Sequence, residues 1–569
     1  MSIKIDTKLE SNLLNSIVNK KIDLSEVVSE YPNDYLKGLN ILFINMPLRE
    51  SAIPNTPPQG PALLASRLRE YGANPLILDL NSYRFPKENS ENEFRCLTFE
   101  EAEKLFLQYL SKYGDQDVIA FSGMITTLRW QEFMASVSRK YQPKTFLLSG
   151  GGLATQLKAG LFQWIDELDA IAHSEGDDII LIVGKHLIEK KKKNINFNTS
   201  TNPYYIGKIN GFDRYVYAGD RPKDLERLPF AAWDLLEKDV NGEEVLEKYI
   251  RTPVWGADAN NSSAAPFKMK RSMTTVSSRG CPYACTFCYR GGQGERRYGV
   301  RCEKNLAKEV KWLIDKYNID FVGFPDDNFA VDRRRTAKLP EAFKDINIKW
   351  GTHTRLDEAD DRLEGMAESG CVYIGFGAES ASPEVLNYMK KGGFILKKGT
   401  TKINGFTFPT TMVEGIKNTL NFGIHSNCTW IMGYPGEKLI DLKTSVAFIQ
   451  WQKELVTKGL MPGTSEFKIA SDSINENMFV ATAYPGTEMF KHPKVQKLLN
   501  DNFKISFDVS GEPILDEHYK EYVLELDDAT KLLTNSQGEI LNFGEIPNEQ
   551  FIEIRDLVAK REIHKILDL

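Results

Sequence analysis

Cysteine is scarce in this chain of 569 residues, and the seven that occur show no paired spacing. Such usage favours a reducing compartment over a secreted, disulfide-bonded scaffold. Long apolar runs are also missing, because no stretch approaches the ~20 residues needed to span a bilayer. The first residues, Met1 to Asp6, lack the apolar core of a signal peptide. Together these absences predict a cytoplasmic protein without a membrane span.

Positive charge is not in excess, because 72 Lys and Arg face 78 Asp and Glu, a net charge of −6. A net acidic chain is a poor candidate for general nucleic-acid binding, so we expect no nucleic-acid partner. The one basic run, Lys190 to Lys193, favours the end of a solvated helix over a phosphate track. The length exceeds what one hydrophobic core supports and predicts three or four domains.

Three of the seven cysteines, Cys281, Cys285 and Cys288, fall within eight residues. The apolar run from Met273 to Val276 and a glycine precede them, which predicts a loop directly after a strand. Thiolates this close repel one another as anions and make poor disulfide partners, whereas a soft metal centre would hold them together.

Zinc would need a fourth ligand, and no further cysteine or histidine lies within ten residues of the trio. A [4Fe–4S] cluster normally takes four cysteines, so three leave one iron open to a ligand that is not protein. A chance grouping of cysteines or a zinc knuckle is the alternative.

The pattern Cys-x3-Cys-x2-Cys, with Phe287 before the last cysteine, resembles the motif of the radical S-adenosylmethionine (SAM) family. The resemblance implies that Cys281, Cys285 and Cys288 hold a [4Fe–4S] cluster and that Phe287 lies in the SAM site. In that family the open iron binds the amino and carboxylate groups of SAM. An electron from the reduced cluster then splits SAM and gives a 5′-deoxyadenosyl radical.

Upstream of these cysteines, buried-strand runs alternate with helical patterns. The strand runs lie at 41–45, 75–80, 118–121, 145–148 and 168–172. The alternation predicts an α/β fold with a doubly wound, Rossmann-like parallel sheet, whose ligands bind beyond the carboxyl ends of the strands. Ser122 and Gly123 follow the third strand, and Gly150 and Gly151 follow the fourth. Small residues there let a large ligand approach the backbone, or they form ordinary turns.

Several segments of this half resemble the cobalamin-binding domain of B12-dependent radical SAM enzymes. They are Pro57 to Pro61, Ser174 to Asp177 and Asp224 to Asp234. The alternative to a cobalamin site is a flavin site or a degenerate domain that binds no cofactor. The resemblance implies cobalamin contacts from Ser122, Gly123, Gly150 and Gly151. The first histidine is His173, so the early loops offer no imidazole to coordinate cobalt from below.

Downstream, six further strand runs alternate with helices. They begin with the strand before Cys281 and continue at 321–324, 348–352, 372–377, 428–432 and 478–482. Six strand–helix units suit the incomplete (βα)6 barrel of radical SAM proteins, where chemistry takes place at C-terminal strand ends. The resemblance implies SAM contacts from Glu379, Ser380 and Gly433. Helix capping is the alternative role for Ser380, and also for Asp327 and Asn328 after the second strand.

These interpretations divide the chain into five parts. We expect an N-terminal helical extension (1–36), a cobalamin-binding domain (37–200), a linker (201–272), a radical SAM domain (273–490) and a small α-rich capping domain (491–569). An insertion at 392–415 is expected to line or cover the substrate cavity.

The leading hypothesis is a cobalamin-dependent radical SAM methyltransferase, which methylates an unactivated carbon by means of a 5′-deoxyadenosyl radical and methylcobalamin. The expected partners are a small-molecule or peptide substrate and an external electron donor of flavodoxin or ferredoxin type. A non-methylating enzyme on the same cofactors, such as an anaerobic oxidative ring cyclase or a ring-rearranging enzyme, is the first alternative. A non-catalytic cobalamin- or cluster-binding sensor is the second. No residue is assigned a catalytic role.

Overall fold

The computed structural model describes residues 28–48, 54, 56–87, 94–193, 204–219, 221–252, 269–289, 298–526, 532–535 and 537–569. The chain forms two compact units. Unit 1 comprises Met1–Tyr249, Gly291–Gly294 and Ile514–Lys531, and unit 2 comprises Ile250–Arg290, Glu295–Pro513 and Leu532–Leu569. Most of the predicted N-terminal extension lies outside the described residues.

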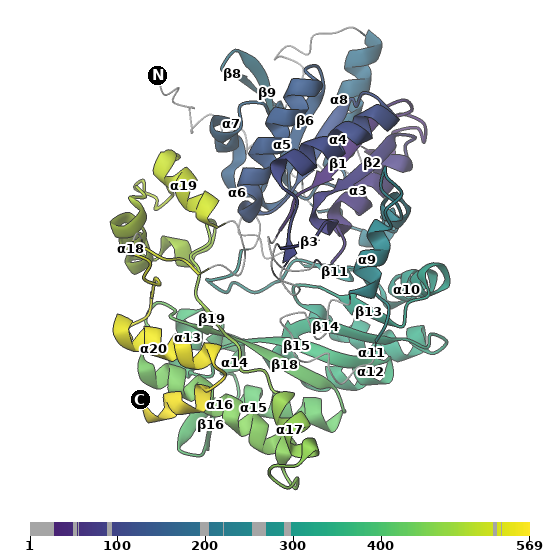
Figure 1. Ribbon diagram of the computed structural model, residues 1–569. Helices are drawn as coiled ribbons and strands as arrows, with labels where there is room; N and C mark the ends of the chain where they lie inside the picture. The colour runs from purple at the N-terminus through teal and green to yellow at the C-terminus, as the bar shows by residue number, and fades with distance from the viewer. Residues whose placement is uncertain are drawn as a thin grey trace. The chain divides into compact units, whose positions relative to one another are not determined.

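Unit 1 is built on a seven-stranded sheet with the order β2-β1-β5-β6-β7-β9-β8 (Figure 1). Its strands are β1 (Asn40–Asn45), β2 (Asn74–Asp79), β5 (Val118–Ser122), β6 (Phe146–Gly150), β7 (Ala170–Ser174), β8 (Tyr205–Ile209) and β9 (Phe212–Gly219). All neighbouring pairs are parallel except β8 and β9. The strand order reverses between β1 and β5, which is where a doubly wound sheet opens a crevice for a ligand.

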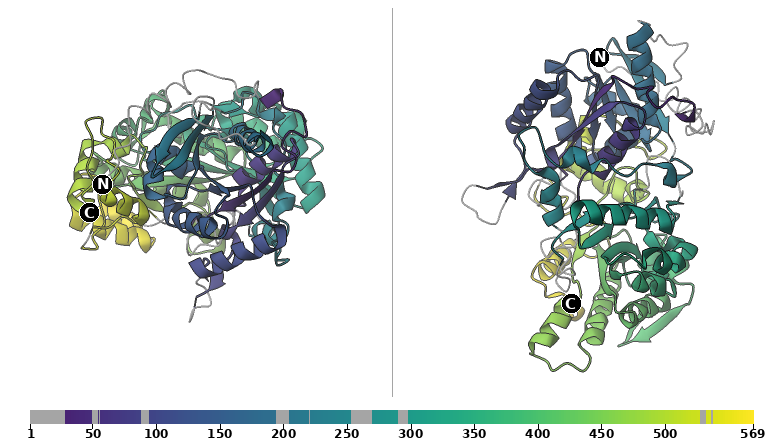
Figure 2. Two further views of the ribbon diagram at one scale, coloured as in Figure 1. Left: turned by 90° about the horizontal axis from the view of Figure 1, so that it is seen from above. Right: turned by 90° about the vertical axis from the view of Figure 1, so that its right-hand side faces the viewer.

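Helices cover both faces of this sheet (Figure 2). Helix α3 (Gln59–Arg69) contacts α8 (Ile179–Lys193), whereas α4 (Phe99–Tyr113) contacts α5 (Leu128–Tyr141). Strand β1 is buried from Ile41 onward, because its apolar run packs against helices on either side. All five strands predicted here are present, and the predicted doubly wound sheet is confirmed.

Two segments join unit 1 that the sequence interpretation had placed elsewhere. Strands β8 and β9 lie in the predicted linker, and the turn between them contains Asn210 and Gly211 with φ of 52° and 85°. This is the backbone that an Asn-Gly hairpin adopts. From the predicted capping domain, α19 (Glu517–Glu525) packs Tyr519 against Trp164, with ring centroids 5.4 Å apart.

Unit 2 contains a six-stranded parallel sheet with the order β10-β13-β14-β15-β18-β19. Its strands are β10 (Ser272–Thr274), β13 (Phe321–Phe324), β14 (Lys349–Arg355), β15 (Cys371–Glu379), β18 (His425–Met432) and β19 (Met478–Val480). The strands follow one another in chain order with helices between them, which is the pattern of an open half-barrel (Figure 1). The predicted set of six strands is confirmed.

The predicted insertion forms α14 (Gly392–Ile395) and a hairpin of β16 (Thr400–Ile403) and β17 (Phe406–Pro409). The hairpin packs on α16 (Leu439–Thr457), where the rings of Phe408 and Phe448 lie 5.1 Å apart. Near the C-terminus, α20 (Asn548–Ala559) contacts the last turn η10 (Ile563–Asp568), which packs on α16. In the described part of the chain, no helix has both the length and the apolar character to cross a membrane.

Candidate functional site

The three clustered cysteines lie on a loop at the carboxyl edge of the half-barrel. The loop leaves the short strand β11 (Ser278–Arg279), which pairs with β12 (Gly299–Val300). Cys285 is buried, Cys281 is half-buried and Cys288 is exposed, and none of the three forms a disulfide. The sequence prediction of a loop directly after a strand is therefore confirmed.

Asp326, at the end of β13, anchors the start of this loop. Its buried carboxylate accepts hydrogen bonds from the Ser277 backbone N–H at 2.8 Å and from the Ser278 hydroxyl at 2.6 Å. Arg335 then donates to the Ser277 carbonyl oxygen at 3.1 Å. Neighbouring Asp327 has a raised pKa because of burial and the Asp326 charge, although it accepts a hydrogen bond from the Gly280 backbone.

Helix capping was the alternative to a functional role for Asp327 and Asn328, the residues after the second strand of the half-barrel. Asn328 makes no side-chain cap to the short helical turn that follows it. Instead, its side-chain oxygen accepts a hydrogen bond from the Thr354 hydroxyl at 2.6 Å. Helix capping therefore does not account for Asn328, whose side chain joins β13 to β14.

The thiols of Cys285 and Cys288 are coupled to each other. A hydrogen bond from Cys288, together with the charges of Lys391 and Arg355, lowers the pKa of Cys285 to about 6. The same hydrogen bond raises the pKa of Cys288, and burial raises that of Cys281. The loop thus favours a thiolate at Cys285, which is the form that binds a metal.

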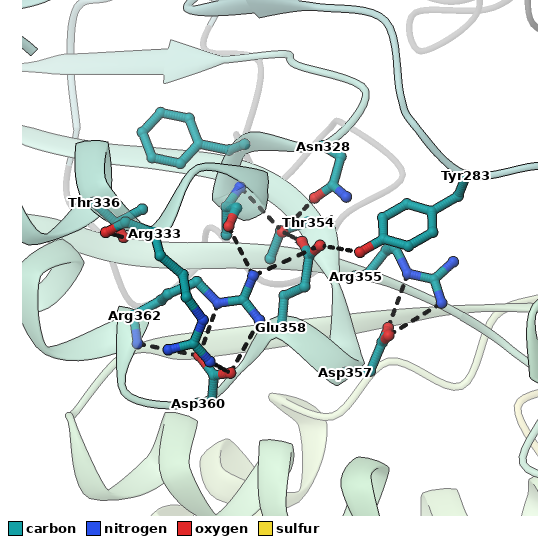
Figure 3. A network of polar contacts seen from close by, with 12 residues as sticks. Tyr283, Asn328, Arg333, Thr336, Thr354, Arg355, Asp357, Glu358, Asp360 and Arg362 are labelled. Atoms are coloured by element: carbon teal, nitrogen blue, oxygen red, sulfur yellow. Dashed lines mark hydrogen bonds and ion pairs between the residues drawn. The ribbon is translucent and has the colours of Figure 1, made fainter. Parts of the chain in front are cut away.

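Arg355, the last residue of β14, reaches this thiol. Its Nη1 lies 3.7 Å from Cys285 Sγ, while its Nε and Nη2 hold Asp357 at 2.9 and 3.2 Å. Figure 3 shows the fork between Arg355 and Asp357, with the ring of Tyr283 beside the guanidinium. The guanidinium carbon lies 4.0 Å from the centroid of that ring. Arg355 is therefore fixed on several sides.

The network continues away from the cysteines to Glu358, a buried acid after β14. Glu358 accepts a hydrogen bond from the Tyr283 hydroxyl at 2.7 Å, and its second oxygen lies 3.0 Å from the Thr354 hydroxyl. Arg362 lies 3.7 Å from the same carboxylate, as Figure 3 shows. Tyr283 is thus tied to the barrel at both its ring and its hydroxyl, and the cysteine loop is tied with it.

Glu379, predicted to contact SAM, ends β15 in a left-handed conformation with φ of +66°. Its carboxylate pairs with buried Lys391 at 3.2 Å, and Lys391 also donates to the Gly377 carbonyl at 2.6 Å. A side chain at Gly377 would come within 2.5 Å of the carboxylate. A non-glycine residue held at positive φ is costly and is found preferentially at functional sites.

The other predicted SAM residues occupy different surroundings. Phe287 lies beside Lys391, whose Nζ is 6.0 Å from the ring centroid. Ser380 is buried, and its hydroxyl contacts Ser445 at 3.2 Å and accepts from the Ser382 backbone at 3.1 Å. Ser382, not Ser380, caps the helix that follows, α13 (Pro383–Tyr388). SAM contacts by Phe287, Glu379 and Ser380 remain predictions.

Gly433 follows β18 with φ of +74°, and its N–H donates to buried Glu437 at 2.6 Å. A side chain there would meet the ring of Phe551 at 2.9 Å, so the C-terminal helix α20 packs directly on this turn. Burial raises the pKa of Glu437 to about 8. The glycine is required by this packing, and its contact with SAM remains a prediction.

The side chains of the cysteine loop are of the chemical type that holds an iron–sulfur cluster. Three free thiols share one loop, and two cations stand near the buried one. Within the residues that the structure describes, no three His, Cys, Asp or Glu side chains converge closely enough to hold a metal ion as they stand.

A second glycine-rich edge lies in unit 1, at the carboxyl ends of β5 and β6. A side chain at Gly123 would lie 2.1 Å from the Thr127 hydroxyl, and one at Gly151 would lie 2.7 Å from the Gly123 carbonyl oxygen. The amide of Leu153 donates to the same carbonyl at 3.3 Å. The two loops therefore pack backbone to backbone, which is the packing reason for both glycines.

Gly150 differs from these two, since its nearest neighbours would be 3.8 Å from an added side chain. Ser122 ends β5 and pairs with Gly150 and Asn45 across the sheet, at the point where the strand order reverses. His173 is buried in β7, and burial lowers its pKa to about 4. Cobalamin contacts by Ser122, Gly123, Gly150 and Gly151 remain predictions.

Sequence reasoning missed Lys391 and the structural role of Asp357. Neither belongs to a spaced motif, and Lys391 is the second lysine of a pair in which Lys390 is exposed. Arg355 was noticeable only as a polar residue at a strand end. The available signal was position, because all three residues lie on loops or strand ends at one edge of the half-barrel.

Comparison with known proteins places part of the chain in a family. Residues 275–449 match the Radical SAM superfamily. An uncharacterised methyltransferase of Pyrococcus horikoshii is 24% identical over 472 residues, covering 82% of this chain and 85% of that protein.

Two further relatives match over shorter stretches. Cytidylyl-2-hydroxyethylphosphonate methyltransferase of Streptomyces wedmorensis is 28% identical over 40% of this chain and 39% of its own length. Anaerobic magnesium-protoporphyrin IX monomethyl ester cyclase of Rubrivivax gelatinosus is 21% identical over 53% of this chain and 51% of its own. The chain therefore spans about half or less of these two relatives.

Among solved structures, the radical SAM methyltransferase TsrM from Kitasatospora setae, with cobalamin and a [4Fe–4S] cluster bound, is similar with a TM-score of 0.53. It is 13% identical, and the match covers 81% of this chain and 75% of that one. A structure of the same enzyme with tryptophan substrate and a SAM analogue gives the same TM-score over 88% and 84%. The likeness confirms the predicted α/β fold.

Proposed function

We propose, from the premise that this chain is a radical SAM enzyme with relatives among B12-dependent methyltransferases and cyclases, that it is a cobalamin-dependent methyltransferase. One observation carries the proposal. A single chain holds two sheets, one edged by a loop with three free cysteines and the other by loops packed glycine to glycine. The first edge suits a cluster and SAM, and the second suits a large flat cofactor.

When bound, the cluster and SAM supply a carbon-centred radical, and cobalamin supplies a methyl group. The residues of this chain would hold these groups in place. Cys281, Cys285 and Cys288 provide the thiolates, and Asp326 fixes the strand from which their loop leaves. Glu379 presents a partly buried carboxylate that suits the ammonium or hydroxyl groups of SAM.

In unit 1, the chain's contribution is a close-packed edge. The loops after β5 and β6 contact each other through the backbone at Gly123 and Gly151, and no side chain projects from these two positions. Ser122 stands beside them with a hydroxyl that can donate or accept. His173, with a pKa lowered to about 4 by burial in β7, would stay neutral at physiological pH.

The proposal is tested without knowledge of the substrate. Protein loaded anaerobically with cluster and cobalamin is mixed with methyl-labelled SAM and a low-potential reductant. We expect labelled methylcobalamin to form on the protein and 5′-deoxyadenosine to appear. Deoxyadenosine without any label on cobalamin would contradict the methyltransferase proposal.

A non-methylating cyclase is the second candidate, because relatives in three organisms carry that activity in their names. It uses the same cofactors without net methylation. The same labelled experiment separates the two, since a cyclase would cleave SAM and leave the label in methionine.

A further inference from the structure

Two buried cations stand beside the buried thiol of the cysteine loop, and neither belongs to the cysteine motif. Arg355 Nη1 lies 3.7 Å from Cys285 Sγ. Lys391 Nζ lies 6.0 Å from the ring centroid of Phe287, the residue directly before Cys288. Arg355 and Lys391 are 6% and 4% exposed, so water screens their charges little.

The position of Arg355 is fixed by groups on its far side. Asp357 holds Nε and Nη2, the carbonyl oxygen of Lys391 accepts from Nη2 at 3.4 Å, and Tyr283 covers the flat face. The remaining nitrogen, Nη1, is the one directed at sulfur. The arrangement therefore aims a hydrogen-bond donor at Cys285 and keeps the balancing carboxylate behind it.

Lys391 is balanced in a different way. Its partner Glu379 is 12% exposed and held at positive φ, whereas Asp357 is 5% exposed. The Glu379 carboxylate lies 3.2 Å from the Lys391 Nζ, and its opposite charge offsets the field of that cation. Arg355 is the cation that contacts the Cys285 sulfur directly, whereas Lys391 contacts Glu379 and the ring of Phe287.

We propose that Arg355 is a positioning residue that raises the reduction potential of the cluster, with Lys391 as a weaker second contributor. This rests on the proposed function in one respect, that the cluster is held by Cys281, Cys285 and Cys288. Reduction adds one electron from a low-potential donor, changing [4Fe–4S]²⁺ to [4Fe–4S]⁺ with no proton moved and no bond broken. Because the cluster becomes more negative, a fixed cation and a hydrogen bond to its sulfur favour the reduced form.

The test is a potentiometric titration of the full-length, anaerobically reconstituted protein, followed by the electron paramagnetic resonance signal of the reduced cluster. The reductant is dithionite. We expect Arg355→Gln to lower the equilibrium constant for reduction about tenfold, a potential about 59 mV more negative. Arg355→Lys keeps the charge but loses the fork, so it should fall between this variant and wild type. Lys391→Met should shift the potential in the same direction by less.

Arg333→Gln is the matched control. It removes the same charged group from the same network, but Arg333 is half exposed and pairs with Asp360 and Asp361, away from the thiols. Its potential should equal that of wild type. Equal potentials for wild type, Arg355→Lys and Lys391→Met would overturn the inference, even if Arg355→Gln failed to retain iron.

This outcome is distinct from failure of the proposed function. If wild-type protein takes up no cluster, the cysteine assignment fails. If the cluster assembles and no label reaches cobalamin, the methyltransferase proposal fails while the potentials still decide the role of Arg355. Potentials that shift only when SAM is present would contradict a direct effect on the cluster.

Discussion

The carboxyl edges of the two sheets are prepared for their ligands in opposite ways. At the edge of unit 2, charged side chains crowd around the cysteine loop and hold it from several sides. At the edge of unit 1, side chains are absent at Gly123 and Gly151, and loop backbones contact each other directly. One edge is organised by buried charge and the other by close backbone packing, so substitutions should damage them by different physical routes.

The largest difference should follow from loss of one thiolate. Cys285→Ser should reduce bound iron from about four atoms per chain to almost none, because the cluster then lacks one of its three protein ligands. Formation of 5′-deoxyadenosine should stop. Cobalamin uptake should be unaffected, since its proposed site lies in unit 1. Iron and cobalamin are measured on the same reconstituted sample.

Cys302→Ser is the control for that variant. Cys302 caps helix α10 (Glu303–Tyr317), where the Asn305 N–H lies 3.4 Å from its sulfur. Serine is a better N-cap, so stability and iron content should be retained. Loss of iron in Cys302→Ser would show that this cysteine takes part in the cluster.

The next effect tests the charged anchor of unit 2. Asp326→Ala leaves the Ser277 N–H and the Ser278 hydroxyl without their buried acceptor. Each unsatisfied group costs about 1–3 kcal/mol, so chemical denaturation should show a loss of a few kcal/mol. Asp320→Ala, at the exposed start of the same strand, should cost less, although Asp320 also accepts backbone N–H groups from Lys270 and Arg271. Equal losses would contradict an anchoring role for Asp326.

A smaller loss is expected at the glycine edge of unit 1. Gly151→Ala combines a φ of +83° with a 2.7 Å approach to the Gly123 carbonyl, so it should destabilise by about 1–3 kcal/mol and weaken cobalamin binding. Gly150→Ala meets nothing closer than 3.8 Å and should change stability by less than about 0.5 kcal/mol. Cobalamin content is measured in both variants, so that a change in packing can be told apart from the loss of a contact with the ligand. Full retention in Gly151→Ala would remove this edge from the proposed site.

The last effect concerns Glu437 and appears only as a dependence on pH. Burial raises its pKa to about 8 from an ordinary value of 4.5, and the charge of Asp441 adds to this. Between these values the folded protein holds a proton that the unfolded chain has released, so stability falls as pH rises, by at most about 1.4 kcal/mol per pH unit. Glu437→Gln should flatten this decline in thermal unfolding curves. Identical slopes for both proteins would contradict it.

The strands of both sheets and the cysteine loop could be predicted from the sequence, each for a different physical reason. The strands of both sheets were predictable because buried parallel strands are continuous apolar runs, such as Ile41 to Ile44. The cysteine loop was predictable because thiols at fixed spacing have few other uses. Residues 204–219 were assigned to a linker because their polar, aromatic alternation is weaker, although Asn210-Gly211 is a recognisable hairpin signal.

The surroundings of the cysteines could not be predicted, because they come from residues far apart in the chain. Arg355 and Lys391 approach Cys285 from positions 70 and 106 residues away in sequence, taken as the differences of their residue numbers. No local pattern marks a lysine that will be buried beside a carbonyl. Ser380 is a residue that a motif match predicts to contact SAM, and its hydroxyl also makes internal contacts to Ser445 and the Ser382 backbone that no local pattern indicates.

The central claim is that one chain holds both groups, each at the edge assigned to it. The most direct measurement is the content of iron, sulfide and cobalamin per chain after anaerobic reconstitution and gel filtration, for wild type, Cys285→Ser and Gly151→Ala. We expect about four irons and one cobalamin per chain for wild type. Cys285→Ser should keep cobalamin and lose iron, whereas Gly151→Ala should keep all of its iron and lose part of its cobalamin. Wild-type protein that retains its cluster but no cobalamin would contradict it.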